Sequence, residues 1–203
     1  MKRKNSDCGE ISVNLAGQAL YRKKEIEQIH LAIAFPSLNR NDKLFDATQI
    51  MNAILGGSMS SRLFQTVREE LGLAYTVYSY ISAYNECGAL TIYAGVNSDK
   101  YLQSVEAIYK CIEQIKKKNI TEDEFIRGKE QLIASSIFSQ ENTSSQMLLF
   151  GKELLYNDKL YNFEDRVNRI SAVTLNDVFD AIDLNFDEKG KASAIVGAVD
   201  RPL

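Results

Sequence analysis

Residues Ile54–Ser79 read ILGGSMSSRLFQTVREELGLAYTVYS, and this stretch indicates the fold of the chain most directly. A Gly-Gly pair interrupts an apolar helical pattern. A short amphipathic segment follows, with Ser60 or Ser61 as its cap and Leu71 near its end. After a single glycine comes a segment rich in tyrosine and β-branched residues. The stretch therefore predicts a helix end, a short helix and then a strand.

The residues before this stretch predict a strand and a helix. Glu27–Phe35 (EQIHLAIAF) alternates large apolar and smaller residues, as a half-buried strand does, and Pro36 is expected to end it. Asn41 or Asp42 can cap a helix that continues to the Gly-Gly pair. A weaker alternation over Glu10–Leu15 predicts a further strand.

The residues after it predict a hairpin, several helices and a last strand. Leu73–Ala83 and Gly88–Val96 are separated by a short polar turn, which indicates a β-hairpin. Thr121 and Glu124 have the spacing of a capping box. The polar residues 139–145 are either a break between helices or an exposed turn of one long helix. The remaining expected elements are helices over 98–118, 121–137, 144–156, 162–172 and 175–182, and a strand over 193–199.

This order of elements predicts an α+β domain with a mostly antiparallel sheet and helices packed on one face. Strands and helices are segregated along the chain, and a hairpin lies in the middle. We expect one domain over residues 10–203. Residues 1–9 are expected to be an N-terminal tail or a cloning boundary.

The composition excludes several classes of function. The chain has 203 residues, is 45% hydrophobic and 25% charged, and has a net charge of -3, which is ordinary for a globular domain. Lys116–Lys118 is the candidate basic stripe, but it follows a helical pattern and is expected to form a solvated last turn, so nucleic-acid binding is not expected. No run of 18 apolar residues predicts a membrane span. Three cysteines without metal spacing suit a cytoplasmic protein. The single histidine, His30, excludes a zinc centre of paired histidines within this chain.

Arg68 and Tyr75 are the candidate functional residues. They lie seven residues apart around the junction of the short helix and the following strand, and both can donate hydrogen bonds to a carbonyl or an oxyanion. Arg68 could instead be a surface residue paired with Glu69, and Tyr75 an ordinary half-buried strand aromatic. Gly56 and Gly57 are most simply a helix stop that needs positive φ.

Other side chains of chemical interest have structural readings. We expect His30 to be a hydrogen-bonded structural residue. Cys87 and Cys111 are expected in the core. A further group of aromatic residues could line a chamber wall or form a sheet face under helices: Tyr78, Tyr80, Tyr84 and Tyr93.

The string GGSMSSRLFQTVREELGLAYTVYS resembles the second domain of the M16 zinc metallopeptidases, a family that includes the mitochondrial processing peptidases and insulin-degrading enzyme. The strings EQIHLAIAFPS, GALTIYAGV, ITEDEFIRGKEQLIAS, AVTLNDVFDAI and ASAIVGAV resemble that domain in the same order. The resemblance covers roughly residues 10–200. It implies that the chain is the C-terminal, non-metal-binding half of an M16 unit.

In that family the catalytic half carries the inverted motif His-x-x-Glu-His with a distant glutamate as third protein ligand. This chain has no such motif, so the resemblance implies no metal here and zinc on a missing N-terminal domain. It also implies that Arg68 and Tyr75 face that zinc site and hold the backbone of an extended peptide substrate. Gly56, Gly57 and Ser58 match the place of a glycine-rich substrate-sensing loop, which is shorter here.

Two functions follow from the resemblance. The first is one half of a zinc endopeptidase, whose partners are the N-terminal catalytic domain and an extended peptide. The alternative is a non-catalytic peptide-binding or scaffold subunit of a processing-peptidase-like complex. A homodimer through the surface that would meet the missing half is a further expectation. A third reading, an unrelated α+β interaction domain, would make the likeness one of fold only.

Overall fold

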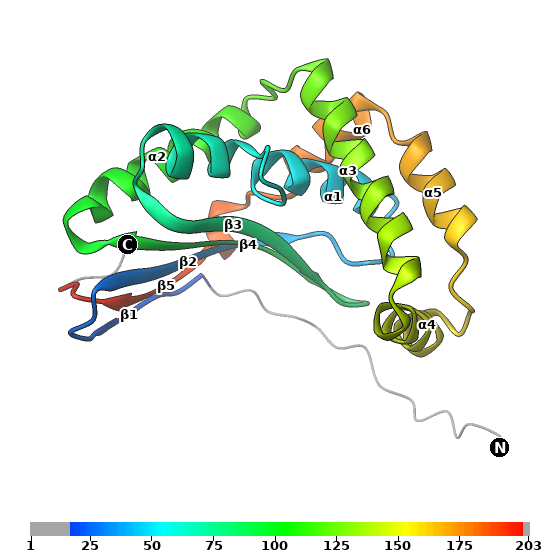
Figure 1. Cartoon of the computed structure of the whole chain (residues 1–203), viewed down its shortest axis with the longest axis horizontal. Helices are drawn as coiled ribbons and strands as arrows, with labels where there is room; N and C mark the ends of the chain where they lie inside the picture. Colours follow the sequence, from blue (N-terminus) through cyan, green and yellow to red (C-terminus); the bar gives the residue numbers. More distant parts are fainter. Residues whose placement is uncertain (1–16, 201–203) are drawn as a thin grey trace.

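Five strands form one sheet in the computed structural model, which describes residues 17–200 (Figure 1). Their order across the sheet is β1-β5-β2-β4-β3. Only β1 and β5 are parallel, and the other neighbours are antiparallel, as the mostly antiparallel prediction requires. The strands span Ala19–Lys23 (β1), Gln28–Ser37 (β2), Ala74–Ala83 (β3), Gly88–Asn97 (β4) and Ala192–Gly197 (β5).

Helices cover one face of this sheet (Figure 1). The α-helices span Phe45–Leu55 (α1), Tyr101–Lys116 (α2), Glu122–Glu141 (α3), Thr143–Asn157 (α4), Phe163–Ala172 (α5) and Leu175–Leu184 (α6). A π-helix, η1, spans Leu63–Glu70, and 3-10 turns span Ser98–Lys100 (η2) and Glu188–Gly190 (η3). The predicted α+β class with helices on one face is confirmed.

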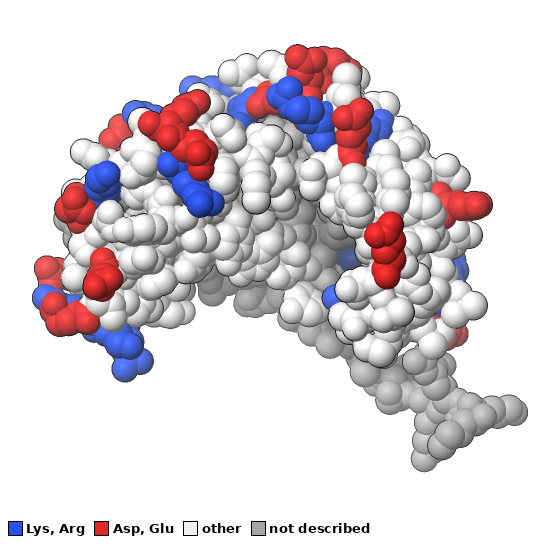
Figure 2. Space-filling view, in the orientation of Figure 1, with Lys and Arg blue, Asp and Glu red and all other residues white. Residues whose placement is uncertain are grey.

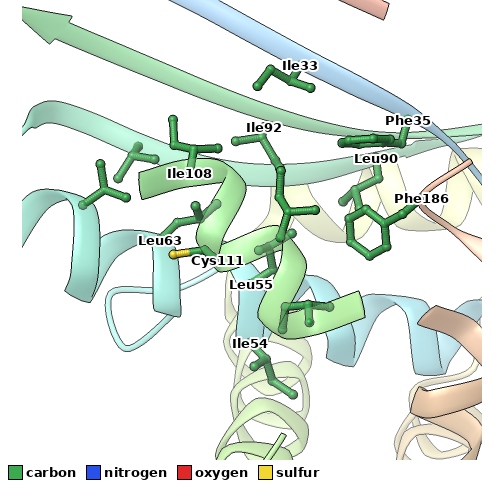
Figure 3. Packing of buried hydrophobic residues seen from close by; sticks show 14 of the residues in the cluster. Ile33, Phe35, Ile54, Leu55, Leu63, Leu90, Ile92, Ile108, Cys111 and Phe186 are labelled. Carbon is green, nitrogen blue, oxygen red and sulfur yellow. The ribbon is translucent and has the colours of Figure 1, made fainter. Parts of the chain in front are cut away.

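The core lies between the covered face of the sheet and α1, α2 and α6. Alternate residues of β2 and β4 point into it, so the period-2 pattern of each strand produces a continuous apolar layer. The ring of Phe35 on β2 meets that of Phe186 edge-on, with 5.3 Å between centroids (Figure 3). Leu63 of η1 belongs to the same layer, which anchors the π-helix to the domain.

Side-chain caps mark the starts of four α-helices, α3 to α6, and Asn162 provides the cap of α5. Thr121 and Glu124 form the predicted capping box at the start of α3. Thr174 and Asp177 form a second capping box at the start of α6. Asn142 ends α3 and accepts a hydrogen bond from the N–H of Ser145 in α4, so the polar residues 139–145 contain a helix break.

Several predicted boundaries are wrong. β2 continues through Pro36 to Ser37, because the neighbouring β5 stops opposite Ala34 and the proline lies where one side of the strand has no neighbour. The sequence ALYRK of β1 lacks alternation and was not predicted as a strand; it lies at the sheet edge with all its residues exposed. The strand predicted over Glu10–Leu15 falls outside the described residues.

Three predicted caps are also wrong. Neither Asn41 nor Asp42 caps α1, which begins at Phe45 after Leu44 without a side-chain cap. Ser98 does not cap α2, which begins after the 3-10 turn, and its hydroxyl donates to the carbonyl of Glu27. Ser61 does not cap η1 and donates instead to the carbonyl of Ser58 at 2.5 Å. Cys111 is buried as expected, whereas Cys87 is only half-buried at the hairpin turn.

No helix within residues 17–200 combines the length and the apolar character that crossing a membrane would need.

Candidate functional site

The Gly-Gly pair brings the end of α1 against the middle of β3. A Cβ on Gly56 would lie 2.6 Å from Oγ and 2.7 Å from the backbone nitrogen of Ser79. The Ser79 N–H donates to the Gly56 carbonyl at 3.0 Å, so the two backbones are in direct contact. Gly56 has φ of -161°, which is extended backbone. Gly57 has no positive φ either, so the expectation of positive φ at the pair is wrong, and Gly56 is needed for close approach.

The segment that carries Arg68 is a π-helix and not an ordinary helical turn. The N–H of Leu71 donates to the carbonyl of Thr66, five residues earlier, at 3.1 Å. Leu63 and Val67 are fully buried, so one side of η1 is held in the core. Gly72, with φ of +58°, then turns the chain into β3. Short π-helical segments occur frequently at functional sites.

The Arg68 side chain is held by an aromatic ring and remains accessible. Its guanidinium carbon lies 4.7 Å from the centroid of the Phe64 ring, one turn earlier on η1. Its Nε atom lies 3.7 Å from Oε1 of Glu69, and 44% of the side chain is exposed. An ion pair of that length in water is worth little, so the stack on Phe64 is what orients the guanidinium.

Tyr75 occupies an irregularity in β3. Ala74 pairs with Val96 and Thr76 with Gly95, so Tyr75 is an extra residue without a partner in β4. Such a β-bulge re-aims a side chain, and here Tyr75 and Thr76 are both exposed although they are consecutive in a strand. Tyr75 is 60% exposed. The bulge therefore presents a phenol to solvent next to the turn that follows η1.

A shallow pocket of about 360 Å³ brings most of the predicted site residues together. Gly56, Gly57 and Ser58 line one side of it and Arg68 another, with β3 from Thr76 to Ser79 as its floor. Tyr75 does not line this pocket. The structure therefore groups the glycine loop with the arginine and leaves the tyrosine beside the group.

Sequence reasoning missed the aromatic and sulfur-containing walls of this pocket. Phe64 and Met59 line it, and Met59 is 76% exposed. The spacing of four residues between Phe64 and Arg68 on a helix was a usable signal, since residues at that spacing share a face. Nothing comparable pointed to Met59, which lies in the loop.

The open face of the sheet carries the predicted aromatic group. The rings of Tyr78 and Tyr93 have centroids 5.1 Å apart, and those of Tyr78 and Tyr80 are 6.0 Å apart. His30 is hydrogen-bonded as predicted, with its Nδ1 2.7 Å from the Tyr93 hydroxyl. Tyr78 and Tyr80 are exposed, so the alternative that they lie under helices is wrong.

Metal ligation has no support in the part of the chain that the structure describes. No group of three or more His, Cys, Asp or Glu side chains within residues 17–200 is placed to hold a metal ion. A resident zinc ion thus does not fit these residues.

The sequence model of the peptidase M16 inactive domain matches residues 7–132, which is more than half of the chain. The chain belongs to the peptidase M16 family. A relative of this M16 domain in Bacillus subtilis, the uncharacterized zinc protease YmxG, is 42% identical over 162 residues, which cover 79% of the chain and 39% of the relative. The uncharacterized zinc protease SCO5738 of Streptomyces coelicolor is 35% identical and covers 84% of the chain and 37% of the relative.

Solved structures share the fold of this M16 domain. The peptidase M16 inactive domain from Pseudomonas fluorescens superposes with a TM-score of 0.80 at 22% identity, over 91% of this chain and 44% of that one. A conserved protein from Enterococcus faecalis gives a TM-score of 0.75 at 22% identity, over 95% of this chain and 44% of that one. The M16 domain thus spans about two fifths of the length of the curated relatives that it matches.

Proposed function

We propose that this M16 domain is the C-terminal half of a zinc-dependent endopeptidase and supplies substrate-binding and oxyanion-stabilising groups to a zinc site on another domain. The observation that carries the proposal is the pocket in which Arg68 and the loop of Gly56, Gly57 and Ser58 meet. Two further facts support it. The relatives named zinc proteases are more than twice as long as their matching regions, and residues 17–200 have no cluster of metal ligands.

Arg68 has the chemistry that peptide hydrolysis needs from such a half. When the scissile carbonyl is attacked, negative charge develops on its oxygen, and a fixed donor nearby lowers the barrier. A guanidinium presents several N–H donors in one plane. The cation–π contact with Phe64 restrains the guanidinium, and 44% of the side chain remains exposed, so its N–H groups can donate to a peptide carbonyl.

Tyr75 would be the second donor. The bulge directs its phenol out of the sheet at the end of β3 nearest η1, and a peptide that lies across both elements would meet the two side chains in succession. We place zinc on the N-terminal partner domain, where it would supply the activation of water, and we expect the substrate to be an extended peptide.

The test uses the complete enzyme, comprising this chain and its N-terminal half, with a quenched fluorogenic peptide as substrate. Arg68→Ala is expected to lower kcat/KM by about 10²-fold or more, the loss typical of one oxyanion donor. Arg68→Lys should recover only part of that activity, because it keeps the charge without the planar fork. Tyr75→Phe should lower kcat/KM less.

Arg22→Ala is the matched control, since Arg22 is exposed on β1 at the opposite edge of the sheet. It should leave turnover unchanged. Unchanged turnover in Arg68→Ala, with zinc still bound to the other half, would refute the catalytic role.

A non-catalytic peptide-binding or scaffold subunit is the second candidate. The matching family model is that of an inactive domain, which is compatible with both candidates. The sequence of that half decides between the two: an intact His-x-x-Glu-His motif supports the peptidase, and a degenerate motif supports the scaffold.

A further inference from the structure

The free edge of β3 has a stretch of unpaired backbone. β3 is the last strand of the sheet, with β4 on one side only. The Tyr84 N–H donates to the Cys87 carbonyl across the hairpin. The backbone N–H and C=O groups of the even-numbered residues near the hairpin end therefore point toward β4. The Ser79 N–H donates to the Gly56 carbonyl on the other side of β3. The backbone groups of the odd-numbered residues therefore point away from β4. The N–H and C=O groups of Ile81 and Ala83 therefore face outward.

This outward stretch is open only between Ile81 and Ala83. Val77 and Ser79 share the orientation but are 3% and 4% exposed, since the Gly56 loop and η1 cover them. Ile81 and Ala83 are half-buried, and within residues 17–200 no hydrogen bond outside the hairpin ladder reaches their backbone groups. The Arg40 N–H, which donates to the Tyr84 carbonyl at 3.0 Å, closes the far end.

Two adjoining pockets extend along this stretch. One of about 720 Å³ is lined by Ile81, Ser82 and Ala83, and another of about 580 Å³ is lined by Tyr80 and Ile81. They share Ile81 and Lys152, so they form one groove between β3 and the nearer side of α4. The volumes are in the range of ligand-binding clefts. Figure 2 shows the hollow of the molecule in this region.

The walls of the groove combine apolar and charged side chains, with basic residues in excess. The larger pocket carries the acids Asp42, Asp46 and Glu153, of which Asp46 and Glu153 are paired with arginines, and five basic residues: Arg40, Lys43, Lys152, Arg166 and Arg169. Leu148 and Leu149 of α4 line the smaller pocket, and Leu148 is 56% exposed. Lys152 and Arg166 are the charged residues that line the smaller pocket, and no acidic residue lines that pocket. Arg166 pairs with Asp46, whereas Lys152 has no ion pair among the residues that the structure describes. An occupant with an acidic group would complement Lys152.

We propose that an extended peptide with an acidic side chain adds to the sheet at Ile81–Ala83, hydrogen-bonded to these two residues, packed on Leu148 and Leu149 and paired with Lys152. Strand addition suits the open edge, because backbone groups supply affinity and alternate side-chain pockets supply specificity. The proposal rests on the proposed function, since it names a binding subsite for the peptide substrate. This subsite is separate from the Arg68 pocket, which touches the groove only at Gly57.

The test uses the 203-residue chain and a fluorescein-labelled seven-residue peptide of alternating valine and threonine with glutamate at its centre. Hydrogen exchange followed by NMR should show the amides of Ile81 and Ala83 unprotected in the free chain and slowed by at least about fivefold with the peptide. The amides of Tyr80 and Ser82 already bond to β4 and serve as internal controls. Absence of new protection at Ile81 and Ala83 would overturn the proposal.

Two variants and a modified peptide distinguish backbone hydrogen bonding from non-specific hydrophobic binding. Ala83→Pro removes one outward N–H and leaves the ladder to β4 intact, and it should weaken binding about tenfold. Ala83→Val keeps the N–H and should bind within about twofold of the original chain. A peptide with every backbone N–H methylated provides a second test that needs no protein variant, and its equal binding would refute strand addition.

The charge is tested at Lys152. Lys152→Ala should weaken the glutamate peptide about threefold to fivefold and leave a peptide with a central lysine unaffected, since a partly exposed pair contributes modestly. Failure of the proposed peptide subsite is distinguishable from failure of the proposed catalytic function. Peptide protection at Ile81 and Ala83 with normal turnover of Arg68→Ala would refute the catalytic role alone, and the converse would refute the subsite alone.

Discussion

Arg62 and Glu124, which are 62 residues apart in sequence, form a bidentate ion pair. Arg62 Nε donates to Oε1 at 2.7 Å, and Nη2 donates to Oε2 at 2.7 Å. Glu124 is also the third residue of the α3 capping box and accepts from the backbone N–H of Thr121 at 2.9 Å. One carboxylate therefore joins the start of the π-helix to the start of α3, and both side chains are at most one fifth exposed.

The first prediction is a loss of stability in acid. Hydrogen bonds from Arg62 lower the pKa of Glu124 from 4.5 to about 2. Because the folded pKa is depressed, the stabilisation is present above pH 4.5 and is lost as the pH falls from there to about 2. Linkage sets an upper bound of about 3 kcal/mol, which solvent screening reduces to about 1–2 kcal/mol. Urea denaturation between pH 2 and 7 measures it.

Glu124→Gln should remove this pH dependence and lower the free energy of unfolding at pH 7 by about 1–3 kcal/mol, because Arg62 would lose a charged partner. The control is Glu106→Gln. Glu106 pairs with Lys110 on the exposed face of α2 at 2.9 Å, and its loss should leave the urea midpoint unchanged. A variant of Glu124 with the same acid sensitivity as the original chain would contradict the assignment.

The second prediction concerns two glycines with opposite surroundings. Gly56→Ala places a methyl group 2.6 Å from Ser79 Oγ and should destabilise the chain by about 2–3 kcal/mol. Gly151→Ala lies in α4 with nothing within 4 Å of its Cβ and should stabilise the chain by about 0.5–1 kcal/mol. Thermal unfolding of both variants measures the difference, and equal effects would show that the contact at Gly56 is not tight.

The third prediction concerns a buried polar cluster between the sheet and the helices α1 and α6. Asn185 is fully buried and donates to Thr48 Oγ1 at 3.2 Å and to the Ala181 carbonyl at 2.6 Å, while Ser37 donates to its Oδ1 at 2.5 Å. Asn185→Ala leaves several buried groups without partners and should cost about 2–3 kcal/mol. Ser37→Ala should cost about 1 kcal/mol. Chemical denaturation measures the free energy of unfolding of both variants. Similar losses in the two would argue against Asn185 as the residue that holds the cluster together.

The fourth prediction concerns the tyrosine next to His30. Burial raises the pKa of the Tyr93 hydroxyl above its ordinary value of 10. Because the folded pKa is raised, Tyr93 favours the folded state less and less as the pH rises through that range. Absorbance titration of the original chain and of Tyr93→Phe should differ by one phenol that ionises late. A difference spectrum with an ordinary midpoint would show that the hydroxyl is not buried.

Periodicity was sufficient to predict most of the sheet and its covering helices. β2, β3 and β4 alternate because one face of each meets the core, and this signal lies within a few residues of sequence. β1 is an edge strand whose five residues are all exposed, so no burial pattern exists in ALYRK from which to recognise it. Its position depends on β5, about 170 residues later in the chain.

The candidate site residues could be chosen from their chemistry, but their geometry could not be predicted. Arg68 and the glycine pair can be singled out in sequence, because a planar group with several N–H donors requires arginine and a close backbone approach requires glycine. The bulge at Tyr75 and the π-helix could not be predicted, since each adds a single residue to a regular pattern for reasons of tertiary packing. The groove beside Ile81 joins residues from β3 and α4 that no local pattern relates.

The position of β5 has a consequence for how the chain folds during synthesis. β5 lies between β1 and β2 but is made last of the five strands, so β2 lacks its second neighbour until residue 192 has emerged. Until then β2 presents an unsatisfied edge beside a row of large apolar side chains, which is a template for intermolecular pairing. Chains that stall before β5 should therefore aggregate and depend on chaperones, and completion of the sheet should be a slow, late step.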